Sequence, residues 1–304
     1  MKKQSAIRSP MFYTGDKYKI IGEIKKHFPH TINKFIEPFV GGGSVLLNVE
    51  ADKFCENDID TNIINLHKFI SSFSDVSEIE KLLFTEIENY NLSCSYIQNP
   101  VPLELREQFK KTYFAKYNKP YFSKMKDDYN DGLKKNNTIL YLLLIYGFNR
   151  MLRFNREGKY NVPVGNVDYN QNVHDALSNY ISIVNKKNII WSNKDFVSFL
   201  NSINYEENDF VYLDPPYLIT ASEYNKLWDR EDDDKMMNIL DDFTRRNIKF
   251  AMSNVVNYKG QENTKLLKWA EKYNIYPITS NYINYHDNSI KTFREVLITN
   301  YEAD

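Results

Sequence analysis

The chain has 304 residues, a formal net charge of −1, and 42% hydrophobic and 15% aromatic residues; this length can build one large or two ordinary domains around a substantial core, and the overall charge points to no class of partner. No stretch approaches the ~20 apolar residues of a membrane span, and residues 1–5 lead into no apolar signal core, which argues against membrane and secreted classes. We expect a soluble, cytoplasmic protein.

The first predicted elements form a strand, a glycine turn and a helix. Residues 34–39 have the pattern of a short buried strand that breaks at Pro38, because proline lacks the N–H group that a central strand donates. The turn at residues 40–43 ends in three consecutive glycines, and we expect Ser44 to cap a helix that continues to Asn48.

A second unit of the same kind follows. Residues 53–56 predict another strand, which ends at Asn57 and Asp58, and residues 61–69 have helical periodicity. Strands that alternate with helices in this way indicate a parallel, doubly wound sheet of the α/β class.

The middle of the chain, residues 67–172, loses this alternation and becomes helix-rich, basic and aromatic. Residues 106–159 contain thirteen Lys or Arg against five Asp or Glu, so the rest of the chain is acidic. This asymmetry is typical of a protein that holds a polyanion with one lobe. An amphipathic helix at residues 104–116 with a solvated lysine face would explain part of the same pattern.

The alternation of strands and helices returns towards the carboxyl terminus. Strands are expected at residues 188–191, 210–213, 249–252 and 295–300, with helices at residues 235–245 and 263–272. The sequence therefore predicts one sheet-bearing domain built from residues 1–66 and 173–304, interrupted by a second domain of residues 67–172.

Asp214, Pro215, Pro216 and Tyr217 follow the apolar strand at residues 210–213, at the carboxyl end where open α/β sheets place their ligands. The two prolines force the backbone out of the sheet and expose a carboxylate, carbonyl groups and an aromatic face. Such an elbow suits a flat ring with an amino group, because the carboxylate and a proline carbonyl can accept its two N–H groups while the tyrosine stacks on it. The alternative is an ordinary turn closed by a half-buried tyrosine.

The glycine turn lets backbone approach a ligand at the start of a helix, where N–H groups are unpaired. Gly41 and Gly43 fit either a dinucleotide phosphate or the carboxylate of S-adenosylmethionine. Asp58 is placed to accept hydrogen bonds from ribose hydroxyls, unless it only caps a turn or a helix. Lys17, close after Gly15, is either a surface lysine or a further ligand contact.

The cysteine and histidine patterns argue against metal chemistry. Cys55 and Cys94 stand in unrelated contexts, and the five histidines lack the spacing of a helical metal site. We therefore expect neither a disulfide framework nor a zinc site, and no metal-dependent catalysis.

The order of these motifs resembles the Dam-like (α-group, D12 class) DNA adenine-N6 methyltransferases, in which the target-recognition domain lies between the cofactor loop and the catalytic box. The resemblance spans nearly the whole chain. It rests on residues 13–17, the run Glu-Pro-Phe-Val-Gly-Gly-Gly at residues 37–43, Asn57-Asp58, residues 149–165 with their Asn-Val-Pro triplet, Asp195-Phe196, the Asp-Pro-Pro-Tyr (DPPY) box and residues 295–300. The run at residues 151–155, together with Ser222-Glu223-Tyr224 and a tryptophan beyond the DPPY box, also resembles the methyltransferase that partners the EcoRV endonuclease.

The resemblance implies a Rossmann-like, S-adenosylmethionine-dependent methyltransferase fold with an inserted, mostly helical target-recognition domain at residues 67–172. It also implies a cofactor site. The residues expected to form that site are Tyr13, Gly15, Lys17, Pro38, Phe39, Gly41 and Gly43, with Asp58 at the ribose and Asp195 and Phe196 at the adenine. Double-stranded DNA is the implied substrate, and a restriction endonuclease is a partner by family habit.

The DPPY box would act by positioning. The amino nitrogen of adenine is a poor nucleophile because its lone pair is delocalised into the ring. Hydrogen bonds from both of its N–H groups, to Asp214 and to the Pro215 carbonyl, favour a pyramidal nitrogen that can attack the sulfonium methyl group without a metal or a covalent intermediate. An amino group inside a duplex cannot reach such a pocket, so we expect the base to flip out and stack on Tyr217.

Residues 149–165 are expected to recognise the DNA sequence. The resemblance assigns DNA contacts to Asn149, Met151, Arg153, Asn155 and Pro163. Arg153 can form a bidentate contact with a guanine edge or contact a phosphate instead, whereas Met151 and Pro163 either pack on a thymine methyl group or belong to the core.

Two departures argue against the tetranucleotide that Dam reads. Phe12 replaces the lysine with which Dam-like enzymes read a guanine beside the target, and residues 164–168 lack the usual basic and aromatic side chains. The half of the pattern that remains predicts a target that contains adenine-thymine-cytosine, with the adenine methylated.

Three other functions remain open to the same sequence. Cytosine-N4 methylation acts on a similar amino group, a non-catalytic DNA-binding protein could retain the fold, and a nucleotide-dependent dehydrogenase could use the glycine loop. Intact Asp214 and Tyr217 argue against a non-catalytic DNA-binding protein. A dehydrogenase would leave the proline-rich elbow and the basic insertion unexplained.

Overall fold

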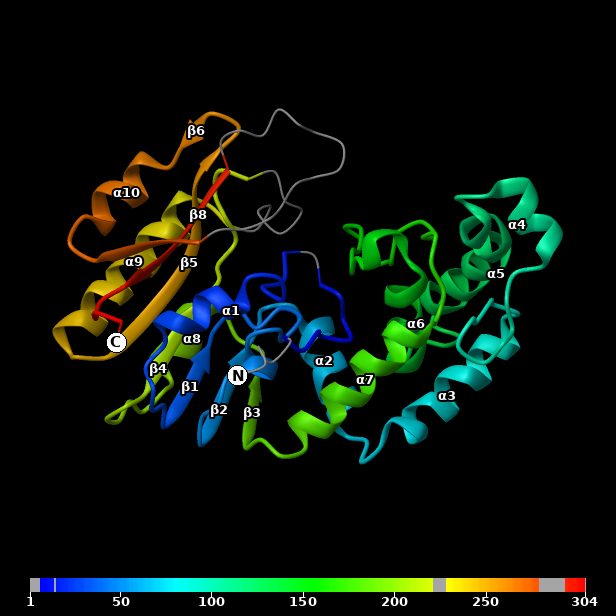
Figure 1. Ribbon diagram of the computed structural model, residues 1–304, viewed down its shortest axis with the longest axis horizontal. Coiled ribbons are helices and arrows are strands. Elements are labelled where there is room, and N and C mark those ends of the chain that lie inside the picture. The colour runs from blue at the N-terminus through cyan, green and yellow to red at the C-terminus, as the bar shows by residue number, and fades with distance from the viewer. Residues whose placement is uncertain (1–5, 14, 221–227, 279–292, 304) are drawn as a thin grey trace.

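The computed structural model describes residues 6–13, 15–220, 228–278 and 293–303 of the chain. Within these residues one side of the molecule contains a mixed sheet with the strand order β3-β2-β1-β4-β5-β8-β7, and β6 pairs with β5 (Figure 1). The strands are β1 (Lys34–Glu37), β2 (Lys53–Asn57), β3 (Ile189–Ser192), β4 (Phe210–Leu213), β5 (Lys249–Tyr258), β6 (Gln261–Glu262), β7 (Asn274–Ile278) and β8 (Phe293–Thr299).

The half of the sheet from β3 to β5 is parallel, as the alternation of strands and helices predicts. β4 lies in the middle of the whole strand order and is buried at all four positions, which explains its unbroken apolar sequence. Because parallel strands point the same way, their carboxyl ends share one edge of the sheet. That edge is where the predicted motifs meet.

The other half of the sheet is antiparallel and was only partly predicted. β8 lies between β5 and β7 and pairs with both in the antiparallel sense. The sequence analysis did not predict β7, because the segment does not resemble a central strand. It contains Pro277, and Ile278 is its single fully buried residue. Proline is tolerated there because β7 is an edge strand.

Helices lie beside the sheet in two groups (Figure 1). They are α1 (Ile21–Ile24), α2 (Thr61–Ser71), α3 (Val76–Asn89), α4 (Leu103–Phe109), α5 (Tyr113–Asn130), α6 (Asn137–Tyr146), α7 (Gln171–Val184), α8 (Phe196–Asn201), α9 (Arg230–Arg245) and α10 (Thr264–Ala270). Helices α3 to α6 gather to one side of the sheet, beyond α2 and α7, whereas α8, α9 and α10 lie with the sheet.

One continuous hydrophobic cluster joins the two parts of the chain. It contains side chains of α3, α5 and α6 together with Met11, Phe12 and side chains of α2 and α7. The predicted domain boundaries, after residues 66 and 172, fall inside α2 and α7. The division into a sheet domain and an inserted recognition domain therefore stays a prediction.

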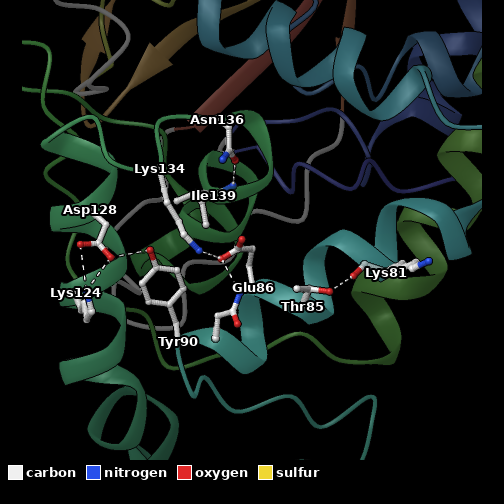
Figure 2. Close-up of polar contacts among 10 residues, drawn as sticks. Lys81, Thr85, Glu86, Tyr90, Lys124, Asp128, Lys134, Asn136 and Ile139 are labelled. Carbon is white, nitrogen blue, oxygen red and sulfur yellow. Dashed lines mark hydrogen bonds and ion pairs between the residues drawn. The ribbon is translucent and has the colours of Figure 1, made fainter.

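Polar contacts tie the helical part together (Figure 2). Lys134 pairs with Glu86 at 2.6 Å, and the Tyr90 hydroxyl donates to Asp128 at 2.8 Å. Lys124 also pairs with Asp128, at 2.9 Å. Two of the thirteen basic residues counted in this region are thus neutralised within the protein, so the excess positive charge depends on the others.

The helix predicted from Ser44 to Asn48 is wrong. The structure has only a 3-10 helix there, η2 (Leu46–Asn48), which begins without a side-chain cap. The Asn48 side-chain amide donates to the Ser44 and Ile7 carbonyls, each at 2.8 Å, and Val49 already has extended backbone. These contacts hold the segment as a single turn.

The alternative interpretation of residues 104–116 as one amphipathic helix is not supported, because two helices share this segment. α4 ends at Phe109, and α5 begins at Tyr113. Lys110 has a φ of 36°, in the left-handed region that a helix cannot continue through, and its N–H group closes the last turn on the Arg106 carbonyl at 2.8 Å.

Candidate active site

The carboxyl ends of four parallel strands border one cavity of about 1460 Å³. Most of the residues expected at the site line it. These are Tyr13, Gly15, Lys17, Pro38, Phe39, Gly41, Asp58, Arg153, Asn155, Asp195, Phe196, Asp214, Pro215, Pro216 and Tyr217. Four expected residues are not among its lining residues, namely Gly43, Asn149, Met151 and Pro163. The cavity therefore joins the glycine turn, the DPPY box and part of the predicted recognition segment.

Close packing explains the glycines of the turn. A Cβ atom on Gly42 would lie 2.7 Å from the Tyr13 Cβ, and one on Gly43 would lie 2.9 Å from the His67 Cε1. Gly41 and Gly43 also have positive φ angles of 47° and 75°, which favour glycine. The turn can take this path only without side chains.

His67 supports the turn from α2, a role that the sequence did not suggest. Burial lowers its pKa to about 4, so the ring is neutral near pH 7. Its Nε2 lies 2.9 Å from the Gly41 carbonyl and its Nδ1 lies 2.6 Å from the Tyr180 hydroxyl. Because the carbonyl only accepts, Nε2 carries the hydrogen and Nδ1 accepts from Tyr180.

Asp58 is tied to the glycine turn rather than to the start of α2. Its carboxylate accepts from the Gly41 N–H at 3.0 Å and from the Asp60 N–H at 2.9 Å. The cap of α2 is Asp60, whose side chain accepts from Asn62. Burial raises the pKa of Asp58 to about 6. Asp58 thus fixes the turn and keeps further acceptor capacity at the cavity wall.

Aromatic rings form another wall of the cavity. Phe196 begins α8 directly after its cap, Asp195, which accepts from the Ser198 N–H. The Phe196 ring lies 5.6 Å from Phe39 and 5.2 Å from Trp228, measured between centroids. Trp228 was not among the expected site residues, although a tryptophan beyond the DPPY box was part of the resemblance to the EcoRV-partner methyltransferase.

Lys17 and the DPPY box meet in a buried ionic cluster. The Lys17 Nζ lies 2.7 Å from the Asp214 Oδ2, and the Tyr217 hydroxyl donates to the Asp214 Oδ1 at 2.7 Å. The Lys17 side chain is only 5% exposed, so it is not the surface lysine of the alternative interpretation. The carboxylate that the sequence placed at the elbow is therefore held at both oxygens.

Glu295 of β8 completes this cluster. Its Oε1 lies 3.8 Å from the Lys17 Nζ and 3.4 Å from the Tyr217 hydroxyl. Burial raises the pKa of Glu295, and the charge of Lys17 opposes that rise. The sequence offers one signal for this residue, because Glu295 is the single carboxylate of the strand predicted at residues 295–300.

A second carboxyl pair lies under the cavity. Glu37 and Glu56 are direct neighbours in the register of β1 and β2, and both are almost fully buried. Burial and the repulsion between the two groups raise the pKa of Glu37 well above its usual range, and burial raises that of Glu56 to about 8. The pair therefore retains at least one proton near pH 7.

Part of the predicted recognition segment folds back on itself beside the cavity. Arg153 donates from Nε to the Asn161 Oδ1 at 2.8 Å and from Nη2 to the Asn161 carbonyl at 3.2 Å. The Asn155 Oδ1 accepts from the Glu157 and Lys159 N–H groups. Asn161 thus fixes the Arg153 side chain, whose guanidinium has further N–H donors. The DNA contacts assigned to this segment stay predictions.

Two sequence observations fall outside the described residues: Thr14 in the first motif and the Ser222-Glu223-Tyr224 run. Across the residues that the structure does describe, no cluster of side chains could hold a metal ion, and no helix is long and apolar enough to cross a membrane. Cys55 and Cys94 are both buried and free.

Comparison with known proteins places this arrangement in a family. Residues 13–283 match the model of the D12 class N6 adenine-specific DNA methyltransferases. The chain belongs to this family. The Type II methyltransferase M.FokI of Planomicrobium okeanokoites is 34% identical over 99% of the chain, and the modification methylase StsI of Streptococcus sanguinis is 32% identical over 98%. A DNA adenine methylase of Escherichia coli (strain K12) is 26% identical over 74% of the chain and 69% of its own length.

This D12-class chain spans less than half the length of its more similar relatives, 44% of M.FokI and 43% of StsI. The family membership confirms the resemblance drawn from the motifs. It also leaves the dehydrogenase interpretation without support.

Proposed function

We propose that this chain transfers a methyl group from S-adenosylmethionine to N6 of an adenine flipped out of double-stranded DNA. One observation carries the proposal: Asp214 and Tyr217 share a single cavity with the glycine turn and Asp58. A site for an amino-bearing base and a site for a methyl donor would thus lie within reach of each other, which positioning catalysis requires.

The charges around the cavity suit a cationic methyl donor. Asp58 and Asp214 line it, and Glu295 stands behind Tyr217, with Lys17 among them. Glu37 also lines the cavity, but its raised pKa means that it offers acceptor atoms there rather than a full negative charge. The Glu37 Oε2 is buried and has no hydrogen-bond partner among the described residues. An unpaired buried acceptor is costly unless a ligand donates to it. S-adenosylmethionine would supply an activated methyl group on a sulfonium together with an ammonium group.

The remaining parts of the donor have matching partners in the chain. Asp58 would accept from the ribose hydroxyls with the acceptor capacity that Gly41 and Asp60 leave. Phe39 and Phe196, which pack on each other, would offer one aromatic surface for the adenine of the donor to stack on.

Asp214 would orient the target nitrogen. Lys17 and Tyr217 each bond one oxygen of its carboxylate, which fixes the direction of that group. Each carboxylate oxygen keeps a lone pair that can accept from the amino group of the target base. The Pro215 carbonyl would accept the second N–H group, and the proton released by transfer would pass to Asp214.

The recognition role of residues 149–165 belongs to the same proposal, including a target with adenine-thymine-cytosine. Mapping of methylated adenines would test the triplet, and modified adenines outside it would contradict it. A restriction endonuclease as partner draws support from the relatives named Type II methyltransferase and modification methylase. Methyl transfer that protects DNA from such an endonuclease would test that role.

The decisive experiment combines the protein with random-sequence duplex DNA and S-adenosylmethionine labelled in its methyl group. We expect labelled N6-methyladenine after hydrolysis of the DNA. The Asp214→Asn variant should lose transfer but bind the donor, and it is preferable to Asp214→Ala because it keeps an oxygen beside Lys17. Labelled N4-methylcytosine would contradict the base assignment, and no transfer to any DNA would refute the enzyme proposal.

A further inference from the structure

Two arginines from different parts of the chain converge on one aromatic ring. The guanidinium carbon of Arg150 lies 3.6 Å from the centroid of the Phe12 ring, and that of Arg8 lies 4.6 Å from the same centroid. The Phe12 side chain is buried at 6% exposure, and Arg150 is partly buried, whereas Arg8 is exposed. Phe12 stands where the Dam-like pattern has a lysine, but Arg150 and Arg8 supply positive charge beside it.

The ring and the nearer arginine are held in place by the fold. The Tyr141 hydroxyl on α6 donates to the Pro10 carbonyl at 3.0 Å, and the Phe12 N–H donates to the Ser9 carbonyl at 3.2 Å. Phe12 packs into the same hydrophobic cluster as α6. The guanidinium of Arg150 is thus stacked on a fixed support, which lowers the entropy that binding would cost.

The backbone at this contact is strained. Phe12 and Arg150 have positive φ angles of 48° and 50°, and Asn149 has one of 52°. Side chains other than glycine disfavour this left-handed region, and such outliers cluster at functional sites. The strain falls on the two residues that stack on each other, so the chain accepts unfavourable backbone to place this guanidinium.

No side-chain hydrogen bond or ion pair engages the guanidinium of Arg150 or of Arg8 within the part of the chain that the structure describes. Asp168, on the Arg150 side, already accepts from Ser95 at 2.7 Å, and Asp16 is the acidic group that acts on Arg8. Burial, with a smaller contribution from the charge of Arg8, lowers the pKa of Arg150 to about 10. Among the residues that the structure describes, these two neighbouring guanidinium groups therefore have no hydrogen-bond acceptor.

The site adjoins the cavity. Tyr13, next to Phe12, lines the cavity, and so does Leu152, two residues beyond Arg150. DNA whose target base entered the cavity would bring neighbouring base pairs to this contact.

We propose that Arg150, supported by Phe12, reads the O6 and N7 acceptors of a guanine close to the target base, while the exposed Arg8 contacts a phosphate. A fixed, stacked guanidinium presents its donors edge-on, which matches the bidentate guanine contact. This inference rests on the proposed function in taking duplex DNA as the ligand.

The test is a binding selection from randomised duplex DNA, with sequencing of the bound pool for four proteins: the unmodified chain, Arg150→Ala, Arg150→Lys and Arg246→Ala. Arg246 is the matched control, since it also lies over an aromatic ring, Tyr205 at 5.3 Å. It follows α9 and precedes β5, so it stands at the edge of the sheet opposite the cavity. Methyl transfer to the same pools is measured in parallel.

We expect the unmodified chain and Arg246→Ala to select guanine at one fixed position. Arg150→Ala should lower that preference about 5- to 150-fold and leave other positions unchanged. Arg150→Lys should restore affinity but not the full preference, because lysine lacks the bidentate fork. A uniform loss of affinity at all sequences, with a salt dependence weaker by about one phosphate contact, would overturn base reading in favour of a phosphate contact. Guanine selection that depends on Arg150 without any methyl transfer would refute the proposed function alone.

Discussion

The buried ion pair between Lys17 and Asp214 makes a quantitative prediction about the stability of the fold. The two groups lie 2.7 Å apart, and their side chains are 5% and 20% exposed. Lys17→Met keeps most of the apolar volume but removes the cation from Asp214 and from Glu295. Removal of one partner of a buried pair costs about 3–5 kcal/mol, because the remaining charge is neither solvated nor neutralised.

Lys26→Met is the matched control. Lys26 pairs with Glu23 at the same distance of 2.7 Å, but these side chains are 59% and 47% exposed. Exposed pairs of this kind contribute about 0–1 kcal/mol. The two substitutions therefore separate the effect of burial from that of distance.

The assay is urea unfolding of the ligand-free protein near pH 8, followed by tryptophan fluorescence. We expect Lys17→Met to lose at least about 2 kcal/mol more than Lys26→Met. The loss should shrink as the pH falls towards about 5. Without Lys17 the pKa of buried Glu295 in the folded state rises further above its unfolded value. The folded state of the variant is then destabilised while Glu295 is ionised, and it regains stability as the pH falls and Glu295 takes up a proton. Equal losses from both substitutions would refute the reasoning.

Three further predictions concern the cavity. Gly43→Ala should destabilise the fold by about 2–5 kcal/mol, because the penalty of left-handed backbone adds to a clash with the buried His67 ring. Gly158→Ala, at a similar φ but in open space, should cost only about 1–2 kcal/mol. Urea unfolding compares the two variants, and equal losses of stability would contradict the packing argument. The affinity for S-adenosylmethionine should fall as the pH drops through about 6, because the Asp58 carboxylate takes up a proton there. Calorimetric titration measures this affinity. If Asp58→Asn shows the same pH dependence, a group other than Asp58 is responsible for it. Tyr217→Phe removes the hydrogen bond to Asp214 but keeps the aromatic ring. The kcat of methyl transfer should therefore fall about 5- to 10-fold, while the affinity for the methyl donor stays unchanged. An unchanged kcat would show that this hydrogen bond does not position the Asp214 carboxylate.

Local sequence was enough to predict the parallel half of the sheet. β4 matches its predicted residues because a short apolar run that is soon followed by two prolines has few other solutions. The motifs were also locatable, because a parallel sheet fixes where the residues after each strand must lie. That geometry brings the glycine turn, Asp58 and the DPPY box to one edge without any knowledge of the loops.

Local sequence failed where distant contacts decide the backbone. The helix expected after Ser44 is replaced by one turn, because Asn48 bonds to Ile7 across a large gap in sequence. The helix at residues 104–116 breaks at Lys110, whose left-handed backbone no propensity predicts. β7 is accepted with its proline because it lies at the edge of the sheet, which only the full strand order determines.

The sequence by itself determined the chemistry that this chain can carry: a carboxylate, a proline carbonyl and an aromatic ring at a strand end, beside a glycine turn. Only the tertiary structure decided which groups act on them. Glu295 reaches Lys17 and Tyr217 from an antiparallel strand, and Arg150 stacks on Phe12 from a distant segment. Burial and charge at such contacts depend on three-dimensional neighbours, and spacing along the chain does not encode them.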